Sequence, residues 1–115
     1  MTIQKFEDLI VWQKSQNLAV KIYSNFSASK DYGFRDQITR ASVSISNNIA
    51  EGFERGSNAD FKRFLYFSLG SNSEVRSMLY LSDKLNYLDK AIAQDLINET
   101  NEVSKMLYAF MKSMK

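Results

Sequence analysis

The sequence contains no cysteine, no histidine and no proline, and only four glycines among its 115 residues. Without cysteine or histidine, the chain has no disulfide, no Cys/His zinc site, no cysteine nucleophile and no histidine general base. The scarcity of proline and glycine leaves few turn signals, which disfavours a β-sandwich or barrel built from many short strands. The composition therefore favours an all-α protein.

Long apolar runs and a strong charge bias are also lacking. No uninterrupted apolar segment approaches the roughly 18 residues of a membrane span, and the N-terminal "MTIQKFEDLIVW" is unlike a signal peptide. We therefore expect a cytoplasmic protein that makes no membrane contact. Fifteen basic and thirteen acidic residues give a formal charge of +2, which alone is weak support for nucleic-acid binding.

What is present is the composition of an ordinary folded domain, 44% hydrophobic and 24% charged. Apolar residues three and four positions apart predict helices over about 9–26, 34–55, 59–85 and 89–114. Gly56 fits the left-handed position that ends a helix, and Ser57 or Asn58 fits the cap of the next. Because the turns are short, we expect one domain, residues 1–115, folded as an antiparallel up-down-up-down four-helix bundle.

Two of the predicted helices carry more apolar residues than one core-facing stripe needs. In the first helix, the predicted stripe is Leu9, Trp12, Gln16, Ala19, Tyr23 and Phe26. The surplus apolar residues are Val11, Leu18 and Ile22 in the first helix and Tyr66, Leu69, Tyr80, Leu81 and Tyr87 in or just after the third. A small monomer buries one stripe per helix, so we expect these residues to form an oligomer interface.

The stretch 40–56, "RASVSISNNIAEGFERG", has helical spacing but few large side chains. Its small residues predict close approach of the following helix near Gly70, since a glycine within a helix costs about 1 kcal/mol relative to alanine. Its polar residues, with two from the following helix, are Arg40, Ser44, Asn48, Glu51, Ser71 and Glu74. They fit a buried network that fixes helix register, a solvated face or a ligand site, and we take the buried network as the working hypothesis.

No set of acid, base and nucleophile can be assembled, and the glycine spacing is not that of a phosphate-binding loop. We therefore expect no enzymatic activity, no metal, no cofactor and no small-molecule substrate. Candidate phosphate contacts are the cations that recur at helical spacing or gather near the turn at 56, namely Lys14, Lys21, Arg55, Lys62, Arg63, Lys105 and Lys112. For each cluster taken alone, an ordinary solvated surface is the better explanation, but an oligomer would multiply the clusters into a basic surface.

Segments 6–23, 34–57 and 61–75 resemble the four-helix-bundle proteins of the 23S ribosomal RNA intervening-sequence family, to which accessory proteins of diversity-generating retroelements are similar. The motif Arg-Ala-x-x-Ser-Ile-x-x-Asn-Ile-Ala-Glu-Gly, here 40–52 and ending at Gly52, carries the resemblance, and Ser71 and Glu74 match a shorter second motif. The resemblance implies an antiparallel bundle, a ring-like homopentamer and no enzymatic activity. For the retroelement relatives, it implies nucleic-acid binding beside a reverse transcriptase.

Two functions of different classes follow as hypotheses. The first is a homo-oligomeric accessory protein that binds RNA or DNA by contacting phosphates through lysine and arginine. The second is a scaffold or adaptor that binds another protein through the aromatic face of the helix over 59–85.

Overall fold

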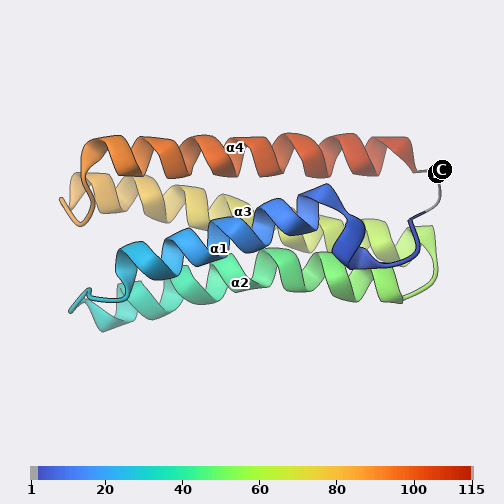
Figure 1. The fold of residues 1–115 in the computed structure, drawn as a ribbon, viewed down its shortest axis with the longest axis horizontal. Helices are drawn as coiled ribbons and strands as arrows, with labels where there is room; N and C mark the ends of the chain where they lie inside the picture. The colour runs from blue at the N-terminus through green and yellow to red at the C-terminus, as the bar shows by residue number, and fades with distance from the viewer. Residues whose placement is uncertain (1–2, 115) are drawn as a thin grey trace.

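The computed structural model describes residues 3–114, which form four long α-helices and one short 3₁₀ turn. These elements are η1 (Phe6–Asp8), α1 (Ile10–Phe26), α2 (Tyr32–Glu54), α3 (Asn58–Lys84) and α4 (Lys90–Ser113). Figure 1 shows the four helices side by side along the long axis of the molecule. The predicted all-α fold with four helices is confirmed for this part of the chain. None of these helices is long and apolar enough to cross a membrane.

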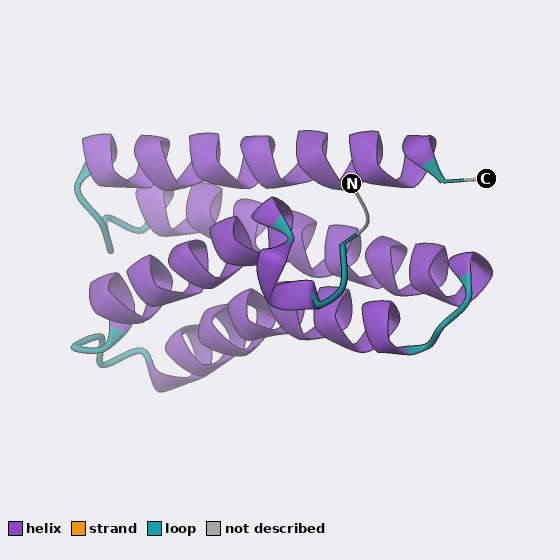
Figure 2. Cartoon of the chain, turned by 45° about the vertical axis from the view of Figure 1, so that its right-hand side comes forward, coloured by secondary structure: helices purple, strands orange, loops and turns teal. Residues whose placement is uncertain are grey.

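Consecutive helices run in opposite directions, as the order of their contacts shows. Gln37 of α2 bonds Glu74 of α3, whereas Ile45, further along α2, accepts a bond from Ser68, which precedes Glu74. In Figure 1 the colours of α1 and α2 likewise progress toward opposite ends of the molecule. Short loops at the two ends, teal in Figure 2, make each reversal.

Local sequence signals set the helix ends near the second turn. Gly56 has a φ of 85°, a left-handed conformation that costs glycine little, and it ends α2 as predicted. Ser57 then caps α3, because its side chain accepts a hydrogen bond of 3.2 Å from the backbone N–H of Asp60. At the start of α2, Asp31 plays the same part by accepting from the N–H of Phe34.

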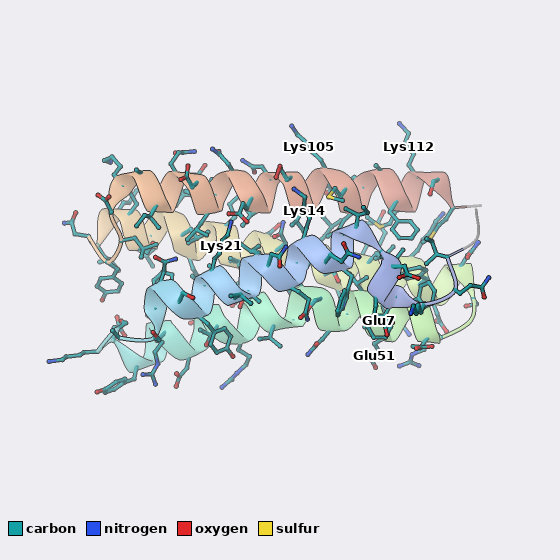
Figure 3. All side chains as sticks on the ribbon, viewed as in Figure 1. Glu7, Lys14, Lys21, Glu51, Lys105 and Lys112 are labelled. Atoms are coloured by element: carbon teal, nitrogen blue, oxygen red, sulfur yellow. The ribbon has the colours of Figure 1, made fainter. Side chains whose placement is uncertain are left out.

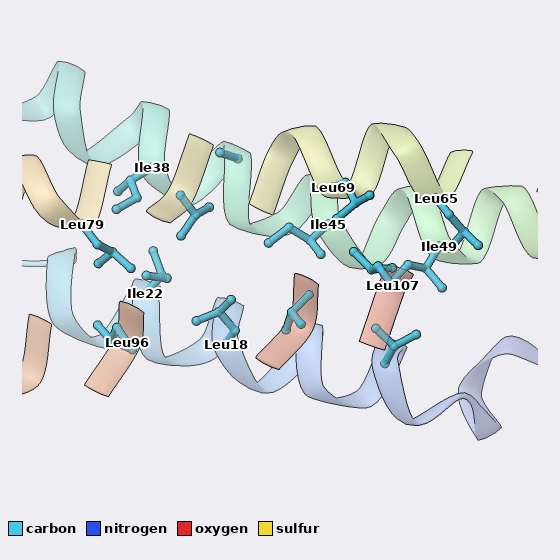
Figure 4. Close-up of a cluster of buried hydrophobic side chains, with 14 of the residues drawn as sticks. Leu18, Ile22, Ile38, Ile45, Ile49, Leu65, Leu69, Leu79, Leu96 and Leu107 are labelled. Atoms are coloured by element: carbon cyan, nitrogen blue, oxygen red, sulfur yellow. The ribbon is translucent and has the colours of Figure 1, made fainter. Parts of the chain in front are cut away.

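The core lies between the four helices and is made mainly of branched aliphatic side chains, ten of which Figure 4 labels. α2 contributes a stripe of residues three or four positions apart, Ile38, Ala41, Ile45 and Ile49, all buried. These side chains pack against buried residues from each of the other helices, such as Leu18, Leu65 and Leu107. Burial of apolar area on this scale is the main term that stabilises a small helical protein.

The apolar stripe of α1 differs from the prediction. Val11, Leu18 and Ile22 were expected on the surface as an oligomer interface, but they are buried in the core. Leu9, Ala19 and Phe26 of the predicted stripe are buried as expected. Gln16 and Tyr23 of that stripe were also expected in the core but are exposed. Both stripes have helical spacing, and the aliphatic one is buried because Gln16 and Tyr23 carry polar groups that would need buried partners.

The surplus face of α3 is also smaller than predicted. Leu69 belongs to the core, so it is removed from the expected oligomer interface. Tyr66, Tyr80 and Leu81 remain on the surface with at least 46% of their area exposed. These three side chains project from the outward face of α3 without helping to bury the core of the chain.

The close approach of α2 and α3 occurs at Gly52 and not at Gly70. A Cβ atom added to Gly52 would lie 2.5 Å from the Cβ of Phe64 and 3.1 Å from the ring of Phe61. A Cβ at Gly70 would meet no atom within 4 Å, so the predicted reason for that glycine is wrong. The helix backbone at Gly70 faces outward, whereas Gly52 lies buried against α3.

These two glycines provide a matched pair for measurement. We expect Gly52→Ala to lower the thermal midpoint, because the crowding of Phe64 costs roughly 1–3 kcal/mol and exceeds the gain in helix propensity. Gly70→Ala should raise the midpoint, because the methyl group enters open space and removes a helix penalty of about 1 kcal/mol. Circular dichroism melts at one protein concentration check both, and equal shifts in the two variants would contradict the close-approach assignment.

A polar contact joins the two loops at the other end of the bundle. The hydroxyl of Tyr87 donates to Oδ2 of Asp31 over 2.6 Å, and the Tyr87 ring packs edge-on against Phe34 at 5.3 Å. The bond from Tyr87, together with that from the Phe34 N–H, holds the pKa of Asp31 below its usual value. The same bond raises the pKa of Tyr87. Tyr87 was predicted as an interface residue, but its hydroxyl serves this contact within the chain.

We expect Tyr87→Phe to raise the pKa of Asp31 toward its usual value of about 3.9. The rise should be incomplete, because the bond from the Phe34 N–H remains. A lowered carboxyl pKa stabilises the fold above the unfolded pKa, and this contribution is lost as pH falls through the folded pKa. The bond that raises the pKa of Tyr87 stabilises the fold below about pH 10, where the hydroxyl is protonated. The variant should therefore lose stability between about pH 4 and pH 10. NMR titration of the Asp31 carboxyl measures the shift, with Tyr80→Phe as control, and an unchanged Asp31 pKa would contradict the assigned cause.

Candidate functional site on the outer seam of α2 and α3

The polar residues of the 40–52 motif lie at the surface and not in a buried network. Arg40, Glu51 and Glu74 are exposed, and Ser44, Asn48 and Ser71 are half-buried. The buried network that we predicted from the sequence is therefore wrong. On α2, the buried stripe through Ala41, Ile45 and Gly52 faces the core, and the polar positions follow the edge of the helix that borders α3.

Short hydrogen bonds run along this edge, some within α2 and some between α2 and α3. The Asn48 amide donates to the carbonyl and hydroxyl oxygens of Ser44 over 2.8 and 3.0 Å, and the Ser71 hydroxyl donates to Oγ of Ser44 over 2.9 Å. One turn further on, the Gln37 amide donates to Glu74 over 3.1 Å. We call this outer edge the α2–α3 seam; its residues are Gln37, Arg40, Ser44, Asn48, Glu51, Arg55, Arg63, Phe67, Ser71 and Glu74.

The buried polar contacts lie elsewhere and involve a residue that the sequence analysis did not single out. Asn72 is fully buried, and its amide donates to the Thr100 carbonyl and to the Ser104 hydroxyl of α4, each over 2.8 Å. The buried Ser68 hydroxyl donates to the carbonyl of Ile45 on α2 over 2.8 Å. These bonds fix the register of α3 against its two neighbours, which is the role predicted for the motif residues.

Two adjoining hollows of about 580 and 550 Å³ lie along the α2 side of the seam and share Asp36, Arg40 and Ser44 as a common wall. Within residues 3–114, the Arg40 guanidinium has no hydrogen-bond or ion-pair partner. The half-buried Asn48 lines the first hollow, and Ser71 lines the second. The unpaired guanidinium can bind a phosphate or a carboxylate. Each hollow is also lined by two carboxylates, those of Asp36 and Glu51 in the first and of Asp36 and Glu74 in the second.

Arginine and phenylalanine side chains stack at the end of the seam near Gly56. The Arg55 guanidinium lies 4.7 Å from the centre of the Phe64 ring, and the Arg63 guanidinium lies 5.0 Å from the same ring. Arg63 also lies 5.7 Å from the ring of Phe67, which contacts Phe64 edge-on at 5.4 Å. Distances of this order are those of cation–π contacts.

Four of the seven predicted phosphate contacts form ion pairs within the chain. Lys14 pairs with Glu102 and Lys21 with Glu99, which connects α1 to α4. The hydrogen bond from Lys21 to Glu99 and the charge of Glu99 raise the pKa of that lysine. The other two pairs are Arg55 with Glu51 and Arg63 with Asp60. Exposed pairs of this kind leave side-chain donors available but reduce the local positive charge.

The remaining three predicted contacts, Lys62, Lys105 and Lys112, have no ion-pair partner in the described part of the chain. Figure 3 shows Lys105 and Lys112 pointing away from the bundle on the outer side of α4, whereas Glu51 lies at the opposite edge of the view. The structure therefore does not bring all the predicted cations onto one face. It places two unpaired lysines on α4 and two paired arginines at the end of the seam.

The exposed position of Glu51 changes what its removal should do. We expect Glu51→Ala to change the free energy of unfolding by less than about 0.5 kcal/mol, because an exposed Glu–Arg pair on a helix contributes little. Asn72→Ala should cost roughly 1–3 kcal/mol, because it leaves buried partners on α4 without their bonds. Urea unfolding measures both, and a loss of several kcal/mol in Glu51→Ala would restore the buried-network hypothesis.

A solved crystal structure shares this fold. A crystal structure from Bacteroides thetaiotaomicron, described as a protein with unknown function from the S23 ribosomal protein family, is similar with a TM-score of 0.84. It is 29% identical over 90% of this chain and 100% of that chain. No curated protein matches the sequence. The family model described as 23S rRNA-intervening sequence protein matches residues 7–109, and because this is most of the chain, the protein belongs to that family.

Proposed function

We propose that this protein is a non-enzymatic, cytoplasmic, homo-oligomeric accessory protein that binds RNA or DNA by contacting phosphates. The observation that carries this proposal is the pair of unpaired lysines on the outer side of α4, Lys105 and Lys112. Membership of a family named for 23S rRNA intervening sequences supports nucleic acid as the partner. The sequence similarity to accessory proteins of diversity-generating retroelements supports it further.

The geometry of the two lysines suits phosphate contacts without base readout. They are seven residues apart on one helix, which places them on a common face about 10 Å apart along its axis. Flexible ammonium groups bind phosphate oxygens as point charges and do not distinguish one base sequence from another. Two such contacts in one chain bind weakly, so repetition of the pair in an oligomer is needed for useful affinity.

The oligomer that we propose is a ring, a homopentamer by resemblance to the family. Its interface is the outward face of α3, where Tyr66, Tyr80 and Leu81 are exposed. Aromatic and aliphatic side chains gathered on one exposed helix face form a surface that another copy can cover.

The same aromatic face favours one alternative function. Tyr66 and Tyr80 are of the residue type that dominates binding energy at protein interfaces, and a different protein occupying this face would make the chain a scaffold or adaptor. The two functions differ in whether purified protein self-associates and binds nucleic acid without another component.

The test is a titration of purified protein against a structured ribosomal RNA fragment and a DNA duplex over a series of salt concentrations, with the mass of the protein measured by light scattering. We expect an oligomer whose affinity falls steeply with salt. Replacing Lys105 and Lys112 with glutamine should reduce the slope of log affinity against log salt by about two or more. The control variant replaces Lys30 and Lys84 with glutamine, which removes the same charge elsewhere and should leave the slope nearly unchanged.

An oligomer that binds neither nucleic acid at low salt would contradict the proposed function and favour the scaffold. A monomer would contradict the ring. Equal loss of slope in the two double variants would show that net charge, and not the α4 lysine pair, determines binding.

A further inference from the structure

One exposed aromatic ring at the end of the seam is not explained by the packing of the chain. Phe67 is 47% exposed and lies outside the hydrophobic core, whereas its neighbour Phe64 is buried. The Phe67 ring is held by an edge contact with Phe64 and by the guanidinium of Arg63. These contacts fix the orientation of the ring but leave about half of the side chain in contact with water.

Two arginines at this end of the seam retain hydrogen-bond donors for a ligand. Arg55 donates to one carboxylate oxygen of Glu51 over 3.2 Å. Arg63 donates to one carboxylate oxygen of Asp60 over 3.4 Å. A guanidinium has five N–H donors, so most of the donors on each arginine are available. About half of each of these two side chains is exposed.

The seam continues from this cluster over further polar groups of both helices. On α3, Phe67, Ser71 and Glu74 follow one another at steps of four and three residues and so lie on one face of the helix. On α2, the unpaired Arg40 lies fifteen residues before Arg55, a distance of about 22 Å along the helix. Between these two arginines lie the polar Ser44 and Asn48.

We propose that the α2–α3 seam binds single-stranded nucleic acid, with one unpaired base stacked on Phe67 and with phosphates bound by Arg55 and Arg63 at one end and by Arg40 at the other. This inference rests on the proposed function and specifies the form of nucleic acid that is bound. Bases in a duplex are already stacked on their neighbours and cannot cover an isolated ring, whereas an unpaired base is free to do so.

At this end of the seam, stacking contributes more to the proposed binding than charge does. The three basic residues around the turn, Arg55, Lys62 and Arg63, are matched by the three acidic residues Glu51, Glu54 and Asp60. Their net charge is therefore close to zero, and long-range attraction of phosphate is weak there. The stacking contact at Phe67 carries no charge, so its contribution to affinity should change little with salt, whereas phosphate contacts by arginine or lysine weaken as salt rises.

The test compares Phe67→Leu with wild type, using a fluorescein-labelled 12-nucleotide oligouridine and a duplex of equal length. Leucine keeps an apolar side chain but removes the aromatic face. We expect affinity for the single strand to fall about 5- to 150-fold, the range for loss of one stacked base, with affinity for the duplex unchanged. Phe67→Trp should restore or improve single-strand binding. Tyr32→Leu, which removes an exposed aromatic ring that packs against Arg35 at the start of α2, is the matched control and should have no effect.

Each other outcome has a defined meaning. If wild type binds both probes and Phe67→Leu changes neither, the stacking site is wrong and the proposed function stands. Equal weakening on both probes also overturns the stacking site. If Phe67→Leu changes the oligomer mass, the seam is covered by a second copy and not by a nucleotide chain. If wild type binds neither probe at low salt, the proposed function fails and the seam inference fails with it.

Discussion

The contact between Gly52 and Phe64 is the constraint on which much of this structure depends. The absence of a side chain at Gly52 lets α3 approach α2 until a Cβ atom on α2 would overlap Phe64. This approach seats the Phe64 ring against the helix and brings Arg55 of α2 over its face. Arg63, the residue before Phe64 on α3, lies over the same ring. One missing side chain thereby assembles residues from two helices into one stacked cluster.

The same approach determines where the polar residues of the motif lie. When two helices pack closely through small residues, little room remains between them for long polar groups. Ser44 and Ser71 are short enough to bond across the boundary. Arg40 and Glu74 are longer and extend outward. The outcome is a polar outer seam in place of a buried ionic network, which avoids the desolvation penalty of burying charges.

The fold was readable from the sequence because turn signals and apolar spacing agreed at most positions, as at Gly56 and along the α2 stripe that includes Ile45. In α1, two stripes had equal spacing, and periodicity alone did not choose between Leu18 and Tyr23. The seam was less predictable, since helical spacing places Arg40 and Asn48 on one face without showing whether that face is covered. Phe67 and Asn72 were not singled out because spacing within α3 does not show where the neighbouring helices pack. Their packing leaves Phe67 exposed and buries Asn72.

Charge pairing within the chain bears directly on how a nearly neutral protein contacts a polyanion. Ion pairs such as Lys14 with Glu102 neutralise cations where α1 meets α4, so those cations stabilise the bundle more than they attract a ligand. What remains for a ligand is of two kinds. Unpaired lysines such as Lys105 act through long-range attraction, and the ring of Phe67 acts only at contact. In the function that we propose, a chain of this charge would gain affinity by repeating weak sites in an oligomer and selectivity from the aromatic contact.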